Sequence, residues 1–386
     1  MTTKYLHLAV LGHTIASPDN RLRWRRLAAM YPDCRVTVLP PREFHSGSAQ
    51  GGRQIWVAKP FTEGNYVEDP VEYREGRHRR LPYYRGLTSR LRRIRPNVVY
   101  AIGEIFNTVV AQTILSTTFQ FPRPKVLFHT NQNIPYDLHR LRHVLYEKYV
   151  LFGSAAAVAE NATAARVLQD RGFPKPILVQ AAPGASEACF HPGDRDSARR
   201  LIGLPTAAFV VGFVGGFRPE KGVSDLVAAF ATLPDDAILL LVGDGALRGE
   251  IEAQARSLGV MERVVMAGFM PRSDTARFYR AMDVMVLPSR SSAKLAEQFG
   301  NVLAEAMLCG TAVVGSTCGA IPEVIGDAGL VFLEGDIDAL AQSLRRLRDD
   351  PSFRQSLADR GLKRALDEYS ASTLSRRFHD FCVALL

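Results

Sequence analysis

Short, uninterrupted apolar runs recur along the whole chain, and this pattern restricts the fold more than any other feature of the sequence. Stretches with helical character separate consecutive runs. Strands that are apolar at every position are buried on both faces, which is typical of parallel sheets joined by helical crossovers. The pattern therefore predicts an α/β protein. The expected strands lie at 6–12, 97–103, 125–130, 209–216, 237–243, 283–289 and 311–316.

The chain is too long for a single hydrophobic core. Its 386 residues exceed what one core usually serves, so two domains are expected. The alternation of strands and helices falters over residues 180–207, where Pro, Gly, Ser and Asp indicate a loop. We place the domain boundary near residue 185, which predicts an N-terminal α/β domain over 1–185 and a second one that begins at 186.

The positive charge is concentrated at the N-terminal end. The net charge is +9, and residues 1–100 hold 18 Lys and Arg against 8 Asp and Glu, whereas the remainder holds 30 against 31. The basic residues gather at 21–26 and 74–95. Such a surface attracts phosphorylated acceptors, anionic lipid or nucleic acid, although a solvated arginine-rich face has the same composition.

The sequence predicts a cytoplasmic protein. No apolar run is long enough for a transmembrane helix, and the start MTTKYLHLAVLGH resembles a first strand more than a signal peptide. The five cysteines are scattered without a Cys-x-x-Cys pair. A disulfide framework or a zinc site is therefore not expected, and we predict no metal.

The segment 209–222 predicts a phosphate-binding loop. A strand ends in Gly215 and Gly216, and Arg218 and Lys221 follow. Ligands of open α/β sheets bind beyond the carboxyl ends of the strands, where glycines allow a phosphate to approach the backbone and cations neutralise it. The simpler interpretation is a tight turn with a solvated lysine.

The segment AEQFGNVLAEAM, over 296–307, predicts a second part of the same site. A helix is expected to begin near Asn301 and to end at Gly310, and its N-terminus is a natural anion site that Gly300 leaves open. Glu297 precedes this anion site and can accept hydrogen bonds from hydroxyls. Glu305 lies inside the helix and can accept from a diol. A nucleotide sugar, with hydroxyls, a diphosphate and a ribose, satisfies both carboxylates.

The loop between residues 263 and 274 is a further candidate. Backbone atoms of Gly268, Phe269 and Met270 could bind the edge of a nucleobase, and Ser273 or Asp274 is expected to cap the next helix. The same loop serves equally well as scaffold.

Taken together, these segments resemble those of a known family, the retaining family 4 glycosyltransferases. Members of that family have the GT-B fold, in which two Rossmann-like domains face each other across a cleft. The resemblance is dense between about 209 and 335. Residues 369–386 are similar to the family's last helix, which returns to the N-terminal domain, so the second domain is expected over 186–368. The segments that carry the resemblance are GGFRPEKG, LVGDGALRGEIE, AGFM, LPS, EQFGNVLAEAMLCGTAVVGS, GAIPEVIGDAGLVF and YSASTLSRRFHDFCVALL.

The resemblance implies a role for each matching residue. Glu297 would bind sugar hydroxyls near the reacting centre, Glu305 would bind the ribose hydroxyls, and Lys221 would neutralise the diphosphate. The family usually needs no metal, so cations and the helix dipole would take its place. Backbone N–H groups that would contact the sugar and diphosphate are those of Phe299, Gly300, Asn301 and Val302.

Two positions depart from the family pattern. Gly216 stands where many members carry an arginine, and we assign that role to Arg218, two residues later. Many members also have a His-Asp pair after a strand of the N-terminal domain. Here that region is VLFHTNQN, and either His129 or the pair Gln132 and Asn133 would face the sugar. Glu104, after another strand, is a candidate for acceptor binding.

The function that these features predict is sugar transfer from a nucleotide sugar to a hydroxyl acceptor, with retention of anomeric configuration. UDP is the commonest donor base, and GDP is the alternative. The acceptor would be a glycan, a lipid-linked molecule or a small molecule, and the basic N-terminal domain would allow peripheral contact with an anionic membrane. Two enzyme alternatives are a nucleotide-sugar epimerase or hydrolase on the same fold.

Other classes fit poorly. A nucleic-acid-binding protein would show stacking aromatics, a helix-turn-helix or a zinc pattern, and none is present. A nicotinamide dehydrogenase would show G-x-G-x-x-G after the first strand, which instead ends LGHTIASPDN.

Overall fold

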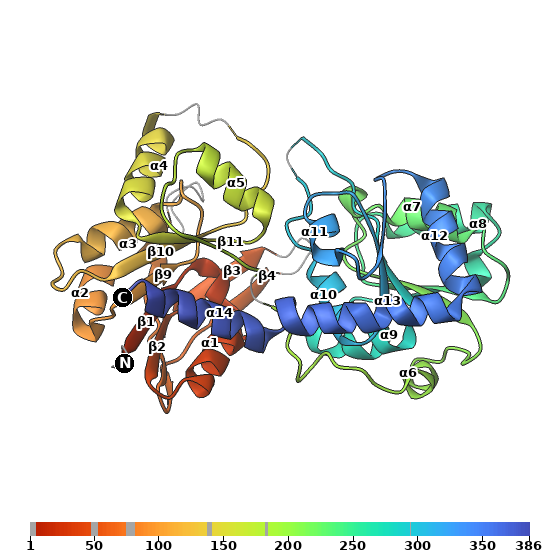
Figure 1. Cartoon of the computed structure of the whole chain (residues 1–386), viewed down its shortest axis with the longest axis horizontal. Coiled ribbons are helices and arrows are strands. Elements are labelled where there is room, and N and C mark those ends of the chain that lie inside the picture. The colour runs from red at the N-terminus through yellow and green to blue at the C-terminus, as the bar shows by residue number, and fades with distance from the viewer. Residues whose placement is uncertain (1–4, 48–52, 75–81, 137–140, 182–183, 294) are drawn as a thin grey trace. The chain divides into compact units, whose positions relative to one another are not determined.

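The computed structural model divides the chain into two compact units (Figure 1). Unit 1 comprises Met1–Pro183 with Leu374–Leu386, and unit 2 comprises Gly184–Thr373. Both contain a parallel sheet with helices on its faces, so the α/β prediction is confirmed. The described residues are 5–47, 53–74, 82–136, 141–181, 184–293 and 295–386.

Unit 1 is built on an eight-stranded sheet in the order β12-β11-β10-β9-β1-β2-β6-β5. Every neighbouring pair is parallel except β5 and β6. The central strands are apolar and buried throughout, which explains why their sequences do not alternate. The strands are β1 Leu6–Leu11, β2 Cys34–Leu39, β5 Phe61–Glu63, β6 Tyr66–Glu68, β9 Val98–Ala101, β10 Lys125–Thr130, β11 Ala156–Ala159 and β12 Ile177–Val179.

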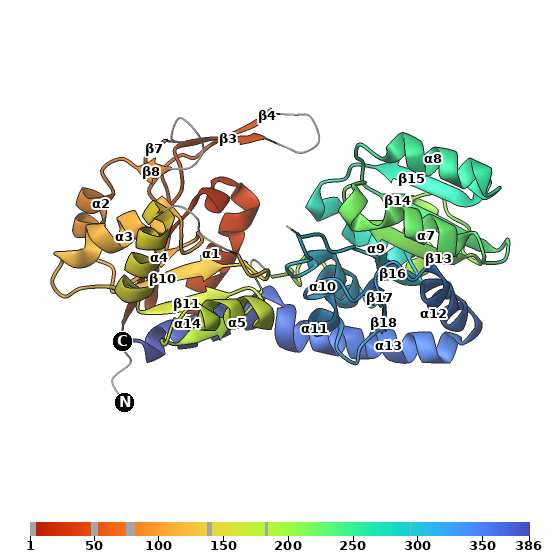
Figure 2. The same cartoon turned by 90° about the horizontal axis from the view of Figure 1, so that it is seen from above.

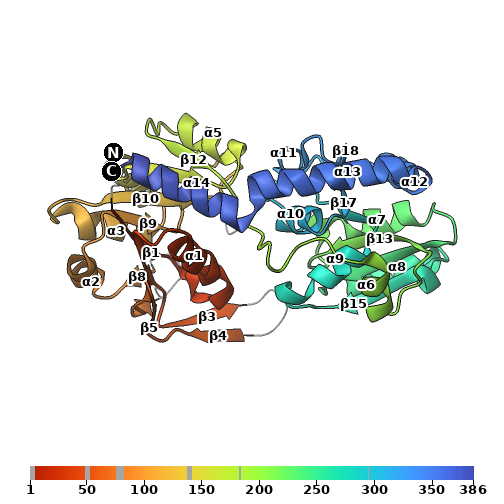
Figure 3. The same ribbon diagram turned by 60° about the horizontal axis from the view of Figure 1, so that its bottom comes forward.

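Helices cover both faces of this sheet (Figure 3). One core contains side chains of α2 Leu87–Ile94, α3 Thr108–Thr118 and α4 Leu141–Gly153. The opposite core contains side chains of α1 Pro18–Met30 and of the last helix, α14 Ala371–Ala384. A further helix, α5 Ala162–Asp170, packs beside β11 and β12. The C-terminal residues of the chain therefore complete the core of unit 1.

Two small hairpins lie outside the main sheet of unit 1. They pair β3 Glu43–Gly47 with β4 Arg53–Val57, and β7 Tyr73–Arg74 with β8 Tyr83–Tyr84. Figure 2 shows the β3–β4 hairpin extending away from the sheet. The basic stretch predicted over 74–95 contains helix α2, while its residues 75–81 lie outside the described residues.

Unit 2 is built on a six-stranded, wholly parallel sheet in the order β15-β14-β13-β16-β17-β18. Numbered within the unit, this is the doubly wound order 3-2-1-4-5-6 of nucleotide-binding sheets. The strand order therefore reverses between β13 and β16, and ligands of such sheets bind at that switch point. The strands are β13 Phe209–Val214, β14 Ala237–Val242, β15 Val264–Gly268, β16 Val284–Leu287, β17 Ala312–Ser316 and β18 Leu330–Phe332.

Eight α-helices are described in unit 2. They are α6 Arg195–Leu201, α7 Val223–Phe230, α8 Arg248–Ser257, α9 Ala276–Ala281, α10 Asn301–Leu308, α11 Ile321–Ile325, α12 Ile337–Asp349 and α13 Pro351–Arg364. A π-helical turn, Ala365–Tyr369, follows α13. Short 3-10 turns are His13–Ala16 in unit 1 and Pro219–Lys221, Met261–Arg263 and Arg272–Asp274 in unit 2.

The predicted cap of α9 is wrong. Ser273 and Asp274 lie in the 3-10 turn Arg272–Asp274, and the residue before α9 is Thr275, which makes no capping bond with its side chain. The hydroxyl of Thr275 instead donates to the carbonyl of Arg272, at 2.8 Å. Ser273 and Asp274 cannot cap α9, because both belong to the 3-10 turn that precedes it.

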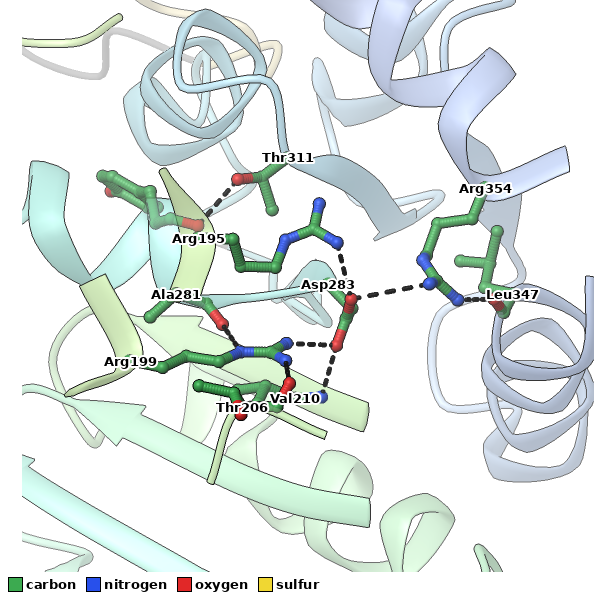
Figure 4. A network of polar contacts seen from close by, with 10 residues as sticks. Arg195, Arg199, Thr206, Val210, Ala281, Asp283, Thr311, Leu347 and Arg354 are labelled. Carbon is green, nitrogen blue, oxygen red and sulfur yellow. Dashed lines mark hydrogen bonds and ion pairs between the residues drawn. The ribbon is translucent and has the colours of Figure 1, made fainter. Parts of the chain in front are cut away.

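A buried carboxylate, Asp283, joins several elements of unit 2 immediately before β16 (Figure 4). It accepts hydrogen bonds from Arg195 of α6 at 3.0 Å, from Arg199 of α6 at 2.6 Å and from the backbone N–H of Val210 at 2.8 Å. Arg354 of α13 lies 3.6 Å away. This network ties β13 and β16, the two strands at the switch point, to helices α6 and α13.

Within the described part of the chain, none of the helices has the length and apolar character needed to cross a bilayer.

Candidate functional site

The glycines after β13 bring several loops of unit 2 into direct backbone contact. Gly215 donates its N–H to the carbonyl of Val242 at 2.9 Å. A Cβ on Gly243 would lie 1.9 Å from the carbonyl oxygen of Gly215, and one on Gly245 would lie 2.5 Å from that of Phe217. Around Gly216 there is more space, since the atom nearest to a Cβ on this residue would be Arg218 Nε, at 3.6 Å. The glycines therefore serve the packing of the loops that follow β13 and β14.

Gly222 holds the loop after β13 against the loop after β16. It has φ +65°, and a Cβ there would lie 1.9 Å from the carbonyl oxygen of Pro288. Only glycine combines this left-handed conformation with such a close approach. Lys221, the preceding residue, is thereby placed at the switch point between the two strands.

Lys221 and Glu297 form an ion pair at this switch point. Lys221 Nζ lies 2.7 Å from Glu297 Oε2, and the hydroxyl of Ser289 donates to the same oxygen at 2.9 Å. The two charged side chains are 20% and 14% exposed, so water screens the pair only partly. The sequence predicted both residues and assigned no role to Ser289, although its segment LPS belongs to the family resemblance.

The backbone around Glu297 is fixed from the opposite side. Its carbonyl accepts the N–H of Ala320 at 2.9 Å. A Cβ on Gly319 would lie 2.2 Å from the same carbonyl oxygen. The carboxylate of Glu297 therefore projects from a firmly held loop segment.

The N-terminus of α10 lies directly after this segment. Gly300 has φ +79°, and no side chain caps the helix there. The first N–H groups of a helix have no partner within the helix, and they form its positive end. Asn301 and Val302 are the first two helical residues, and the buried side chain of Phe299 packs edge-on against Tyr369 at 5.2 Å. The helix thus begins where the sequence predicted, and its role as an anion site stays a prediction.

Glu305 is buried inside α10 and already has two partners. Glu305 is only 3% exposed. Arg272 Nε donates a hydrogen bond to its Oε1 at 2.6 Å, and the hydroxyl of Tyr279 donates to its Oε2 at 2.8 Å. Burial raises the pKa of the Glu305 carboxyl, and the nearby Arg272 opposes that rise. The sequence predicted Glu305 as an acceptor of hydrogen bonds, but it did not identify Arg272 or Tyr279, which lie on a different segment.

The other predicted residues of unit 2 lie on two loops. Gly268, with φ +75°, ends β15, and its carbonyl accepts the N–H of Gly243 at 2.8 Å. Phe269 is 63% exposed, and Met270 Sδ lies 3.8 Å from Arg277 Nη2. Arg218, on the loop after β13, pairs with Glu220 at 3.1 Å, and its side chain is 45% exposed. Arg218 therefore remains accessible to an anion.

Unit 1 gathers a separate set of buried polar groups. His129, in β10, lies 3.0 Å from the hydroxyl of Tyr100 through Nδ1 and 3.9 Å from Glu160 through Nε2. Glu104, after β9, accepts from the Thr130 hydroxyl at 2.7 Å and from the Asn131 N–H at 2.8 Å, and burial raises its pKa.

The other polar residues of the VLFHTNQN segment are also engaged. The amide of Gln132 donates to the carbonyl of Ile134 at 2.7 Å. The polar groups of unit 1 thus collect at the carboxyl ends of β9, β10 and β11, where a second ligand would bind. Among the described residues of both units, no cluster of three His, Cys, Asp or Glu side chains is arranged to hold a metal ion.

The sequence of unit 2 matches a known family. Residues 194–364 match the family described as Glycosyl transferases group 1. The chain is 36% identical over 177 residues to a D-inositol 3-phosphate glycosyltransferase of Mycolicibacterium gilvum, which covers 44% of this chain and 39% of that protein. It is 34% identical over 176 residues to a 2-deoxystreptamine glucosyltransferase of Streptomyces kanamyceticus, covering 44% of each.

A longer match reaches beyond unit 2. A D-inositol 3-phosphate glycosyltransferase of Thermomonospora curvata is 33% identical over 243 residues, which is 58% of this chain and 55% of that protein. The matches to these three curated relatives thus span about half of their length or less.

Solved structures resemble the chain over nearly its whole length. A glycosyltransferase from Rickettsia africae has a TM-score of 0.75 at 14% identity, covering 100% of this chain and 99% of its own. The Anabaena protein HepE in complex with UDP has a TM-score of 0.72 at 17% identity, covering 99% and 100%. Both comparisons concern the fold, which is the GT-B fold of two Rossmann-like domains. Within unit 2, residues 194–364, which include the loops of the switch point, are thus similar to the glycosyl transferases group 1 family.

Proposed function

We propose that this protein transfers a sugar from a nucleotide-sugar donor to a hydroxyl acceptor, with retention of anomeric configuration. The observation that carries the proposal is the 2.7 Å contact between Lys221 and Glu297 beside the N-terminus of α10. In a nucleotide sugar the anomeric carbon is bonded to a phosphate oxygen. The groups that bind the phosphate and the sugar hydroxyls must therefore be neighbours, as these groups are.

Each group has a role in the proposed reaction. Lys221, Arg218 and the N–H groups at Phe299, Gly300, Asn301 and Val302 stabilise the charge that develops on the diphosphate as its bond to the sugar breaks. Glu297 accepts hydrogen bonds from sugar hydroxyls and so orients the anomeric carbon. The acceptor hydroxyl attacks on the face from which the diphosphate leaves, and its proton passes to the departing phosphate oxygen.

A UDP-sugar is the donor that we favour, and a GDP-sugar is the alternative. The fold relative HepE of Anabaena has been solved in complex with UDP and with UDP-glucose. The loop Gly268–Met270 is our candidate for contact with the base. Glu305 is our candidate for the ribose hydroxyls, which would use the lone pairs that Arg272 and Tyr279 leave free.

Unit 1 is our candidate for acceptor binding. Glu104 and His129 lie at the carboxyl ends of its central strands, where a ligand of an α/β sheet is expected. Helix α2 also exposes Arg92 and Arg93, which would favour a phosphorylated or lipid-linked acceptor at an anionic membrane. Co-sedimentation with vesicles, with and without anionic lipid, tests the membrane contact.

The donor site is tested by calorimetric titration of the full chain with UDP, GDP, ADP, CDP and dTDP. We expect one diphosphate to bind the wild type. Glu305→Gln, which nearly preserves the shape of the side chain, should weaken that binding. Lys221→Ala should lower turnover of the matching sugar nucleotide about 10²–10³-fold, because it removes one electrostatic contact to the leaving group. Lys363→Ala, which removes an exposed lysine of α13, serves as the matched control and should leave both measurements unchanged.

Two outcomes would contradict the proposal. Wild-type turnover in Lys221→Ala, with an unchanged circular dichroism spectrum, would remove Lys221 from the mechanism. Binding of none of the diphosphates would exclude a nucleotide donor. Analysis of the sugar product separates transfer from its alternatives, since a hydrolase releases free sugar and an epimerase returns an isomeric nucleotide sugar.

A further inference from the structure

A cavity of about 360 Å³ lies in unit 1, between the edge strands of the sheet and helix α2. Strand β2 contributes Arg35 and Thr37, β5 contributes Thr62, and α2 contributes Arg93. Glu68 and Asp69, at the end of β6, complete its polar lining. Its volume is within the range of small-molecule sites.

The two carboxylates of this cavity are already neutralised. Glu68 pairs with Arg21 at 3.1 Å and accepts the hydroxyl of Tyr66 at 2.8 Å. Asp69 pairs with Arg93 at 2.6 Å and with Arg90. These acidic groups therefore leave no negative charge for a further cation.

Arg35 supplies an unmatched positive charge. Over the ranges of the chain that the structure describes, its guanidinium makes no ion pair and no hydrogen bond. Arg35 is exposed, and Arg93 also lines the cavity. Arg21 and Arg90 pair with the two carboxylates from outside the lining, so four cations face two carboxylates, a surplus of two positive charges. An anion in the cavity would neutralise this surplus.

Neutral polar side chains lie beside Arg35 in the cavity, namely those of Thr37 and Thr62, with His7 behind Thr37. The hydroxyl of Thr37 lies 3.1 Å from Nε2 of His7 on the neighbouring strand β1. Burial, together with the charge of Arg35, lowers the pKa of His7 to about 4, so His7 is neutral at pH 7. The hydroxyl of Thr37 therefore donates to Nε2 of neutral His7, and the hydroxyl of Thr62 can donate to an oxyanion.

This cavity is separate from the groups proposed for sugar transfer. It lies on strands β2, β6 and β5, whereas Glu104 and His129 lie at β9 and β10, on the other side of β1. It also lies in a different unit from Lys221 and Glu297.

We propose that this cavity is an accessory binding site for a phosphate monoester. The phosphate oxygens accept from the Arg35 guanidinium and from the hydroxyl of Thr62, and hydroxyls of the ester group donate to Glu68 and Asp69. The proposal does not depend on the sugar-transfer activity, because the residues that contact the ester, Arg35, Thr62, Glu68 and Asp69, are not assigned to that reaction.

The test is NMR of the full chain with ¹³C-labelled histidine, titrated with inorganic phosphate and, separately, with glucose 6-phosphate at constant ionic strength in chloride. The ring signal of His7, assigned with His7→Gln, reports on the cavity. We expect it to shift saturably with glucose 6-phosphate. In Arg35→Gln the apparent Kd should rise at least tenfold, and in the control Arg92→Gln, which removes an exposed arginine of α2 that does not line the cavity, it should not change.

The comparison of probes and variants decides the result. Saturation by inorganic phosphate alone would reduce the site to a bare anion site and overturn the assignment of an ester. The absence of saturation with either probe, or equal weakening in Arg35→Gln and Arg92→Gln, would overturn the site itself. The His7 signal also verifies that Arg35→Gln has folded, since an unfolded chain loses its distinct chemical shift.

Discussion

Asp283 shows how much of unit 2 depends on a single carboxylate. It is 4% exposed and contacts three arginines and one backbone N–H, so it connects α6, α13 and two central strands. Nothing in the local sequence distinguishes this aspartate from a loop residue before a strand. Its partners Arg195 and Arg354 lie far away in the sequence and are brought together only by the fold.

We predict that Asp283→Ala destabilises unit 2 by about 3–5 kcal/mol, because it leaves buried arginines without a counter-charge. Urea unfolding, monitored by a probe in unit 2, measures the loss. The control is Asp236→Ala, which removes a half-exposed partner of Arg348 and should cost at most about 1 kcal/mol. Equal losses in the two variants would show that the Asp283 network does not stabilise the unit.

At the scale of elements, the candidate donor site depends on a turn as much as on its charged residues. The 3-10 turn Pro219–Lys221 ends at Gly222, whose backbone approaches the carbonyl of Pro288. This approach aligns the loops after β13 and β16 and so brings Lys221 to Glu297. The pair therefore depends on a residue that has no chemistry of its own.

Comparing Gly222→Ala with a control glycine should separate two costs in unfolding free energy. One is the clash of the new Cβ with the Pro288 carbonyl, and the other is the left-handed backbone conformation. The left-handed φ of Gly222 alone costs about 1–2 kcal/mol for a non-glycine residue, and the new Cβ would also meet the Pro288 carbonyl at 1.9 Å. The matched control is Gly259→Ala. Gly259 has a similar φ of +71°, but a Cβ there would meet no atom within 4 Å. We expect denaturant unfolding to show a clearly larger loss for Gly222→Ala, together with weaker nucleotide binding. Equal losses would mean that the loop contact is unimportant.

At the scale of the whole molecule, the last helix returns to the unit in which the chain begins. Phe378 of α14 is fully buried in unit 1, with its ring 5.3 Å from Trp24 and 5.0 Å from Tyr100. Cys382, also fully buried, belongs to the same core. Unit 1 therefore cannot complete its core until the end of the chain is available.

We predict that Phe378→Ala destabilises unit 1 by about 3–5 kcal/mol through the cavity that it leaves. Nucleotide affinity should not change, because the proposed donor site lies in unit 2. Scanning calorimetry measures the first effect and isothermal titration the second, with Phe152→Ala, at a side chain that is 86% exposed, as the control. Loss of nucleotide affinity at a temperature where unit 2 stays folded would contradict the assignment of the donor site to unit 2 alone.

The sequence by itself determined the α/β class, the positions of seven strands (β1, β9, β10, β13, β14, β16 and β17) and the start of α10 at Asn301, because these depend on local apolar runs and glycine turns. It also singled out Lys221 and Glu297 as candidates, because Lys221 follows a strand that ends in glycines and Glu297 precedes the start of a helix. Local signals failed at α9, where a 3-10 turn replaced the expected cap.

Only the tertiary structure decided which of these residues meet. Strand order is set by which sheet edges and helix faces pack together, and periodicity within a strand carries no information about its neighbours. That order places β13 beside β16 and so brings Lys221 into contact with Glu297, 76 residues away. The partners of Glu305 and the cavity at Arg35 arise in the same way, because each is formed by segments that only the packed sheets bring together.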